Sequence, residues 1–250
     1  MGKVDNVYVA TNTGIATDTV IVDCSPIVME APGILICAVF HNGSVAVNPV
    51  QSVQVDGVDM AFLASADTLL TNVSVEFWGV SIKSLASYAV ANTVVAFTPG
   101  SVLNALAAVM DFQQAISSGT PSATASAQGV VSPATCDLSW NGFAANPNNT
   151  VTGPIENSLH LAMIIAHKSV TLMNLSLSAG IEVMSPQTVG SLALTFQCAI
   201  AKAYPDPAIP TTISWAESVD REWCELIVEI PPTSIVDMIR RGVVPVPQLT

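Results

Sequence analysis

The feature that most constrains the fold is an alternation of apolar and polar residues with a period of two. In NVSVEFWGVSI, residues 72–82, one face carries Val73, Val75 and Phe77, and the other carries Ser74, Glu76 and Trp78. The segments TTISWAES (211–218), WCELIVEI (223–230) and CDLSWNGF (136–143) follow the same rule. This period is typical of a half-buried strand. The sequence therefore predicts an all-β fold, which we expect to be one two-layer antiparallel β-sandwich.

Helix is expected mainly in two places. Residues 101–117, SVLNALAAVMDFQQAIS, are rich in good helix formers, although the same run also suits one long apolar strand. Residues 234–241 lie between capping candidates, Thr233 or Ser234, and a terminating Gly242. The sequence thus predicts a single sandwich domain over 1–232, followed by a short helix and an extended arm over 233–250.

One stretch leaves the domain count open. Residues 117–135 are rich in Ser, Ala, Thr and Gly, as in a linker between two domains or a long loop with an edge strand. We favour the loop because apolar alternation resumes directly after it.

The chain also repeats a local pattern. GILICAVFHNGSV (33–45) and SLHLAMIIAHKSV (158–170) each run from an apolar strand to a histidine and a polar break. Each is followed by a strand-Gly-strand unit, in which Gly57 matches Gly180. His41 and His167, 126 residues apart, are therefore expected to end matching strands as structural residues, and His160 to be one more polar residue on an alternating strand.

Charge and composition limit the partners. The chain has 7 Lys+Arg against 19 Asp+Glu, for a net charge of −12. This argues against nucleic acid and anionic membranes, which attract clustered cations. Half of the residues are apolar and only 10% are charged, which favours a homo-oligomer; a large, well-covered core is the alternative. No apolar run approaches the roughly 20 residues of a membrane-spanning helix, and no signal-peptide pattern opens the sequence.

The five cysteines are widely spaced, odd in number and free of C-x-x-C motifs; they are Cys24, Cys37, Cys136, Cys198 and Cys224. We expect all five to be buried, reduced thiols.

Motifs for catalysis and cofactors give no candidate. The chain contains no G-x-S-x-G, H-E-x-x-H, phosphate-binding or dinucleotide-binding pattern, so we expect no enzyme, cofactor or metal site. Asp56 and Asp59 suggest a turn better than a calcium loop. A set of acidic residues near the C-terminus is interpreted as a solvated loop and strand face. The alternative is that two of its members form the carboxylate pair of a glycosidase. The set comprises Glu217, Asp220, Glu222, Glu225 and Glu229. A sugar-stacking platform would need Trp78, Trp215 and Trp223 on exposed faces.

The order of these segments resembles a known type of protein. ILICAVFHNGSV, VQSVQVDGVDM, NVSVEFWGVSI, a Ser/Ala-rich stretch, LSWNGF and LHLAMIIAHKSV are similar, over residues 30–230, to β-sandwich virion proteins of tailed bacteriophages. The resemblance implies a jelly-roll-like sandwich and a capsid decoration (cement) protein located in the virion after assembly in the host cytoplasm. It implies the major capsid protein and other copies of the chain as partners, and no active site. A tail or fibre component and a carbohydrate-binding sandwich are the alternatives.

The C-terminal arm is the expected contact with these partners. Ile235, Met238 and Ile239 recur at helical spacing, so a short helix there has one apolar face. The extended VVPVPQLT follows and suits a groove or an edge of a partner. The residues expected to bind are Ile235, Met238, Ile239, Arg240, Arg241, Val244 and Val246. The opposite hypothesis is that the helix folds back onto its own sandwich.

Overall fold

All the regular secondary structure among the described residues is β-strand. The computed structural model describes residues 3–13, 18–25, 27–29, 33–43, 49–68, 73–82, 88–113, 124–129, 134–138, 159–168, 175–190, 195–203, 211–217 and 222–230. Within these ranges no helix occurs, and so none is long and apolar enough to cross a membrane. Every strand pair is antiparallel. The expected all-β antiparallel fold is therefore confirmed.

The strands divide into two halves. The N-terminal half holds β1 (Lys3–Thr13), β2 (Thr19–Asp23), β3 (Val28–Met29), β4 (Gly33–Gly43), β5 (Val50–Val55), β6 (Val58–Asp59), β7 (Ala61–Asp67), β8 (Val73–Ile82), β9 (Tyr88–Ala89), β10 (Asn92–Phe97) and β11 (Val102–Gln113). The C-terminal half holds β12 (Thr124–Gly129), β13 (Ala134–Leu138), β14 (Leu159–Lys168), β15 (Leu175–Ala179), β16 (Ile181–Val189), β17 (Thr195–Ala203), β18 (Thr211–Glu217) and β19 (Trp223–Ile230).

Each half has an inner and an outer sheet, with the same strand order in both halves. The N-inner sheet runs β1-β11-β4-β8-β7, and the C-inner sheet runs β12-β19-β14-β17-β16. The N-outer sheet runs β2-β10-β5-β6, and the C-outer sheet runs β13-β18-β15. A small pair, β3-β9, completes the N-terminal half. The repeat noticed in the sequence therefore extends to the strand order of the inner sheets and of the three outer strands that both halves share.

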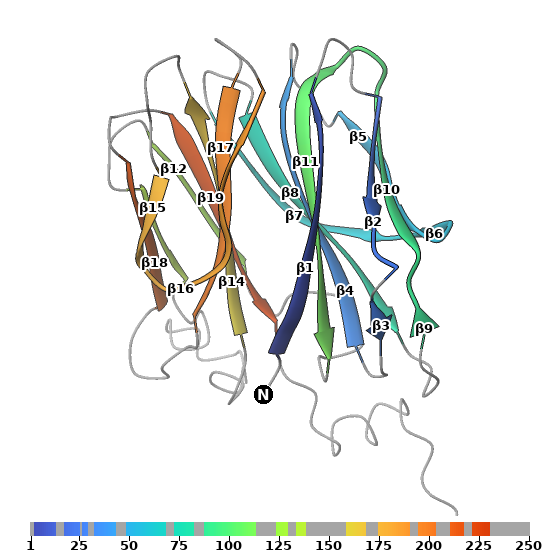
Figure 1. Ribbon diagram of the computed structural model, residues 1–250. Helices are drawn as coiled ribbons and strands as arrows, with labels where there is room; N and C mark the ends of the chain where they lie inside the picture. Colours follow the sequence, from blue (N-terminus) through green and yellow to red (C-terminus); the bar gives the residue numbers. More distant parts are fainter. Residues whose placement is uncertain are drawn as a thin grey trace, which may run out of the picture.

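The four sheets stack as four layers, with the two inner sheets in the middle (Figure 1). A central core between the inner sheets includes Phe40, Phe77, Leu106, Met163 and Leu226. An N-terminal core between the N-inner and N-outer sheets includes Leu35, Val39, Val53, Val95 and Phe97. A C-terminal core between the C-inner and C-outer sheets includes Ala162, Ile164, Ile213, Trp215 and Ile227. The expected two layers are thus doubled, and the high apolar content has an internal cause, because the central strands of each inner sheet are buried on both faces.

The inner sheets meet in a reciprocal way. β1 contacts β16 across the central core, and β7 contacts β12. These are equivalent pairs, since β1 and β12 each open a half, and β7 and β16 each form the opposite edge of an inner sheet. Such reciprocity is the mark of a two-fold relation, here within one chain.

The helix expected over residues 101–117 is wrong. Residues 102–113 form β11, the second strand of the N-inner sheet. Leu106 and Met110 enter the central core, while Ala105 and Val109 enter the N-terminal core. A strand buried on both faces shows no period of two, so its Leu- and Ala-rich composition resembled that of a helix.

Residues 117–135 turn out to combine the two alternatives. They contain β12, an edge strand that pairs with β19, as in the loop interpretation. The part before β12 lies between the last strand of the N-terminal half and the first strand of the C-terminal half, as in the linker interpretation. The alternation that resumes after this stretch belongs to the second half.

When His41 of β4 is aligned with His167 of β14, the faces of the two strands are out of step by one residue. β4 sends Ile34 and Ile36 into the central core, whereas β14 sends Leu161 and Met163 there. A one-residue slip exchanges the two faces of a strand. His41 therefore faces the N-terminal core, while His167, on the opposite parity of its strand, faces the central core. The strands match as expected, but the two histidines do not.

Candidate functional site

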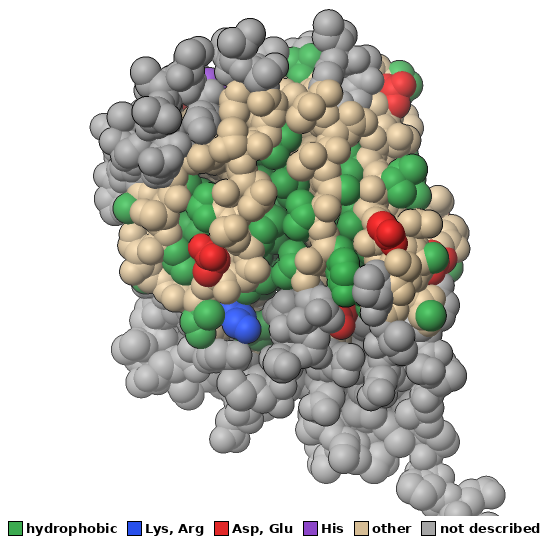
Figure 2. Space-filling view, in the orientation of Figure 1, with side chains coloured by type: hydrophobic (Ala, Val, Ile, Leu, Met, Phe, Trp, Pro, Cys, Tyr) green, Lys and Arg blue, Asp and Glu red, His purple; other side chains and the backbone are tan. Residues whose placement is uncertain are grey.

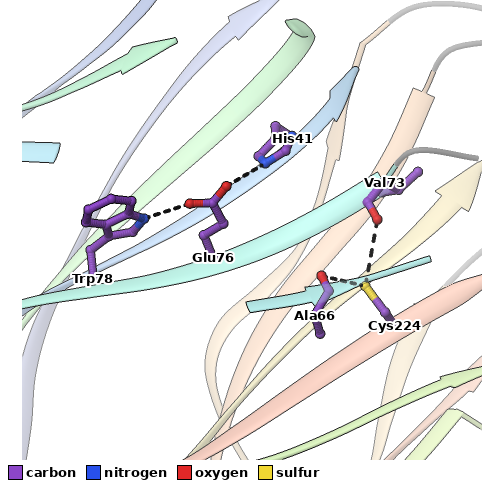
Figure 3. A network of polar contacts seen from close by, with 6 residues as sticks. All are labelled: His41, Ala66, Val73, Glu76, Trp78 and Cys224. Atoms are coloured by element: carbon purple, nitrogen blue, oxygen red, sulfur yellow. Dashed lines mark hydrogen bonds and ion pairs between the residues drawn. The ribbon is translucent and has the colours of Figure 1, made fainter. Parts of the chain in front are cut away.

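The most polar feature inside the N-terminal half is a line of three side chains on β4 and β8 (Figure 3). Glu76 is 6% exposed and His41 is 2% exposed. Glu76 Oε1 lies 3.3 Å from His41 Nε2, and Trp78 Nε1–H donates to Glu76 Oε2 at 3.0 Å. His41 also packs edge to face against Phe97 of β10. Both carboxylate oxygens have partners, as a buried acidic group requires, so the network ties β4 to β8.

We expect Glu76→Gln to lower the free energy of unfolding by about 1–2 kcal/mol, because an amide NH2 would replace one acceptor oxygen opposite a donor. Urea unfolding followed by circular dichroism measures the change. Ser74→Ala, on the same face of β8 and half-buried, is the control and should shift the free energy by less than about 0.5 kcal/mol. Equal effects from the two substitutions would contradict the assignment of Glu76 as a required acceptor.

A second buried carboxylate lies in the C-terminal half. Glu225 of β19 is fully buried, and its Oε1 accepts a hydrogen bond from Trp215 Nε1–H of β18 at 3.0 Å. The expectation of a solvated acidic face is therefore wrong for Glu225 and for the buried Glu222. The reason is that the face of β19 opposite the central core is covered by the C-outer sheet. The side chains of Glu217, Asp220 and Glu229 lie outside the described residues.

The histidines and acidic residues that the structure describes do not gather into a metal centre. Among the described residues, no group of three His, Cys, Asp or Glu side chains is placed to hold an ion. His160 is buried at the start of β14, and His167 is half-buried near its end. Burial lowers the pKa of His160 to about 4, which keeps the ring neutral near pH 7.

Asp56 and Gly57 form the turn predicted from the sequence. Asp56 accepts hydrogen bonds from the backbone N–H groups of Ala91 and Asn92, at 2.8 Å for the Asn92 bond. Gly57 has φ of 80°, and its counterpart Gly180 has φ of 121°, so both strand-Gly-strand units turn through a positive φ. The carboxylate thus holds the hairpin to the loop before β10.

The three tryptophans among the described residues do not share a surface. Trp215 and Trp223 belong to the C-terminal core. Trp78 lies in the other half, half-buried, and meets the exposed ring of Phe62 edge to face at 5.4 Å. Stacking on a sugar needs aromatic faces that converge in one concave patch, so the described residues give no support to a carbohydrate platform.

Four cysteines are buried and free, namely Cys24, Cys37, Cys198 and Cys224. Burial raises the pKa of each of these thiols. Cys224 also joins the two halves, because its Sγ–H donates to the backbone oxygen of Ala66 at 3.3 Å (Figure 3). The side chain of Cys136 lies outside the described residues.

These thiols should resist alkylation in the folded protein, since burial removes both access and thiolate. We expect iodoacetamide to add at most once to the native chain, at Cys136, and five times after unfolding without reductant. Intact-protein mass spectrometry counts the adducts. Three or fewer adducts on the unfolded chain would reveal a disulfide and contradict the free-thiol prediction.

The described surface carries one apolar strip where the halves meet. Val9 of β1 is 42% exposed and Ile181 of β16 is 47% exposed, and the two strands are in contact. Val7 and Val183, on the same strands, pack partly buried against the central core. We call Val7, Val9, Ile181 and Val183 the seam strip. Figure 2 shows hydrophobic side chains gathered along the middle of this face, with charged side chains scattered around them.

The sequence analysis did not predict the seam strip. The sequence feature that could have indicated it is a run of seven uncharged residues over 7–13, VYVATNT. No sequence pattern identified this strand as the edge of a sheet. The partner-binding residues predicted in the arm, together with the expected C-terminal helix, lie outside the described residues.

Comparison with known proteins adds no further constraint. The chain matches no protein-family model, no curated protein and no solved structure. The function is therefore argued from the fold and the surface.

Proposed function

We propose that the protein is a structural component of a virus particle, and in particular a decoration (cement) protein that binds and stabilises a tailed-bacteriophage head. The observation that carries this proposal is the strand order. With the short β3 and β9 left out and β6 and β7 counted as one bent strand, the first, eighth, third and sixth strands of the N-terminal half lie in one sheet, and the second, seventh, fourth and fifth lie in the other. The β7 part of the fifth strand continues along the edge of the first sheet. We interpret this order as an eight-stranded jelly roll. The C-terminal half has the same order, except that its fifth strand, β16, pairs only in the inner sheet.

The jelly-roll interpretation supports a virion role because this architecture is used widely in viral capsids. A structural role also agrees with what the polar groups do. The buried carboxylates of Glu76 and Glu225 and the thiol of Cys224 bond to neighbouring strands, so each stabilises the scaffold. Lectins share the architecture, but the buried tryptophans make a carbohydrate-binding role the weaker proposal. A tail or fibre location remains the alternative within the virion class.

The partners we propose are the major capsid protein and other copies of the chain. The arm over 233–250 supplies the contact, through the apolar face of Ile235, Met238 and Ile239 and through the extended residues Val244 and Val246. Arg240 and Arg241 are two of only seven cations on a chain of charge −12, so they suit acidic groups on another copy. This role needs no catalytic group, cofactor, nucleic acid or membrane.

Cryo-electron microscopy of purified particles tests the proposal. We expect density for two side-by-side jelly rolls on the outside of a head that is closed without them. Stripping the protein with mild chaotrope should leave the shell intact but easier to rupture. Dissolution of the shell together with the protein would contradict a decoration role, and absence of the protein from particles would contradict the virion role altogether.

A further inference from the structure

Among the described strands, β1 has one edge that pairs with no other strand. This strand stands at the end of the N-inner sheet and pairs only with β11 among the described strands. From Val7 to Thr13 it pairs with β11 residue for residue, and its one irregularity lies earlier, between Val4 and Val7. These seven residues contain no charge and no proline. They present a regular row of backbone donors and acceptors.

Proteins normally block such an edge with charges, prolines or bulges. β16, on the other side of the seam, is protected in this way, because it carries Pro186 and two register shifts. β1 lacks these features from Val7 onward. The seam strip lies directly beside this edge and adds exposed apolar surface. The two together suit an added strand that is apolar and extended.

The sequence of the arm has the complementary pattern. Over 243–250, VVPVPQLT, prolines stand at 245 and 247. Backbone N–H groups of an extended chain point alternately to its two edges, and proline has none. The edge with residues 244, 246 and 248 therefore keeps all its donors, whereas the other edge loses two of them. Such a strand can pair on one side only, and its prolines would end the sheet.

We propose that residues 243–250 of a neighbouring copy add to the N-inner sheet as a sixth strand, antiparallel to Val7–Thr13, with the 244/246/248 edge bonded to β1. Apolar side chains of the arm cover the seam strip. This proposal rests on the proposed role of the arm in assembly, and it identifies the edge of β1 as the surface that the arm binds.

Direction and charge favour a neighbouring copy over the same chain. β19 ends at Ile230, at the end of the molecule where β1 begins (Figure 1). An arm that entered there directly from the same chain would run parallel to β1, whereas an arm from a neighbouring copy can enter from the far end. The far-end entry gives an antiparallel pair, like every other pair among the described strands. Two copies of charge −12 repel each other, and the edge and seam strip give them an uncharged place to meet.

The acceptor is tested with the full-length protein by sedimentation velocity over a range of concentrations. We expect the wild type to self-associate and Val9→Lys to raise the dissociation constant at least 10-fold, because a lysine beside a strand edge opposes strand addition. Ile21→Lys is the matched control. Ile21 is 59% exposed on β2 of the N-outer sheet, on the face that points away from the N-terminal core, and its substitution should leave association unchanged. Circular dichroism verifies that both variants fold.

The edge of the arm that pairs with β1 is tested by adding a proline to one edge or to the other. Val246→Pro removes a donor from the bonded edge and should weaken association to the level of Val9→Lys. Val243→Pro removes a donor from the outer edge and should leave association at the wild-type level. Equal effects of the two prolines would overturn the assigned edge.

Truncation after residue 242 separates this inference from the proposed role of the arm. If truncation and Val9→Lys both abolish association, the proposal stands. If truncation abolishes it and Val9→Lys does not, the arm docks elsewhere, and the β1 acceptor is wrong while the role of the arm survives. If the truncated protein associates and decorates heads as before, both are wrong. A wild type that is monomeric at every concentration also overturns the inference.

Discussion

Phe77→Ala is expected to lower the free energy of unfolding by about 3–5 kcal/mol, the usual cost of emptying a buried phenylalanine site. Phe77 lies on β8 in the central core and is completely buried, with strands of both halves around it. The neighbouring strands cannot collapse into the space without disturbing both inner sheets. Equilibrium unfolding in guanidinium chloride, followed by intrinsic fluorescence and circular dichroism, measures the loss.

Phe62→Ala provides the control for this substitution. Phe62 belongs to β7, the strand beside β8, but is 52% exposed. Removing its ring deletes the edge-to-face contact with Trp78 and little buried area, so we expect a loss below about 1 kcal/mol. If Phe77→Ala cost no more than Phe62→Ala, the two halves would not share a packed core.

The second large effect is an acid destabilisation caused by His160. Its pKa is about 4 in the folded protein and 6.5 in the unfolded reference, so between these values the unfolded chain binds more protons. Stability is therefore lost as pH falls from about 6.5 to about 4. With about 1.4 kcal/mol per pKa unit, the full difference is on the order of 3 kcal/mol. Urea unfolding at a series of pH values gives the slope directly.

His160→Gln should flatten this slope, whatever it does to stability at neutral pH. His167→Gln, on the same strand but half-buried, should keep the slope of the wild type. An unchanged slope in His160→Gln would show that other groups cause the acid sensitivity. Neither substitution is expected to remove a bound metal or to alter assembly.

Local patterns were enough to predict the strands that alternate between apolar and polar residues. Alternation in 72–82 and 223–230 identified β8 and β19, and assigned each apolar face correctly to one core. The strand-Gly-strand units at Gly57 and Gly180 were also predicted, because glycine is the residue that adopts a positive φ most readily. These features depend on residues that are adjacent in the chain, so they can be predicted from the sequence.

The candidate site was less accessible to such reasoning. Glu76 was assigned to a solvent-facing side because a strand with one polar face normally has solvent on that face. Nothing in its neighbours reveals that β10 and the rest of the N-outer sheet cover it, or that His41 and Trp78 supply its partners. The seam strip was equally hidden, since whether a strand is an edge depends on which strands pair.

The sequence by itself determined the strand content, the turns and the existence of a repeat, because each arises from the period and composition of short segments. Only the tertiary structure decided the number of layers, the strand identity of 102–113 and the opposite orientations of His41 and His167. These depend on what covers the second face of each inner sheet. That cover comes from residues distant in the chain, and a one-residue difference in strand register reverses which core a side chain enters.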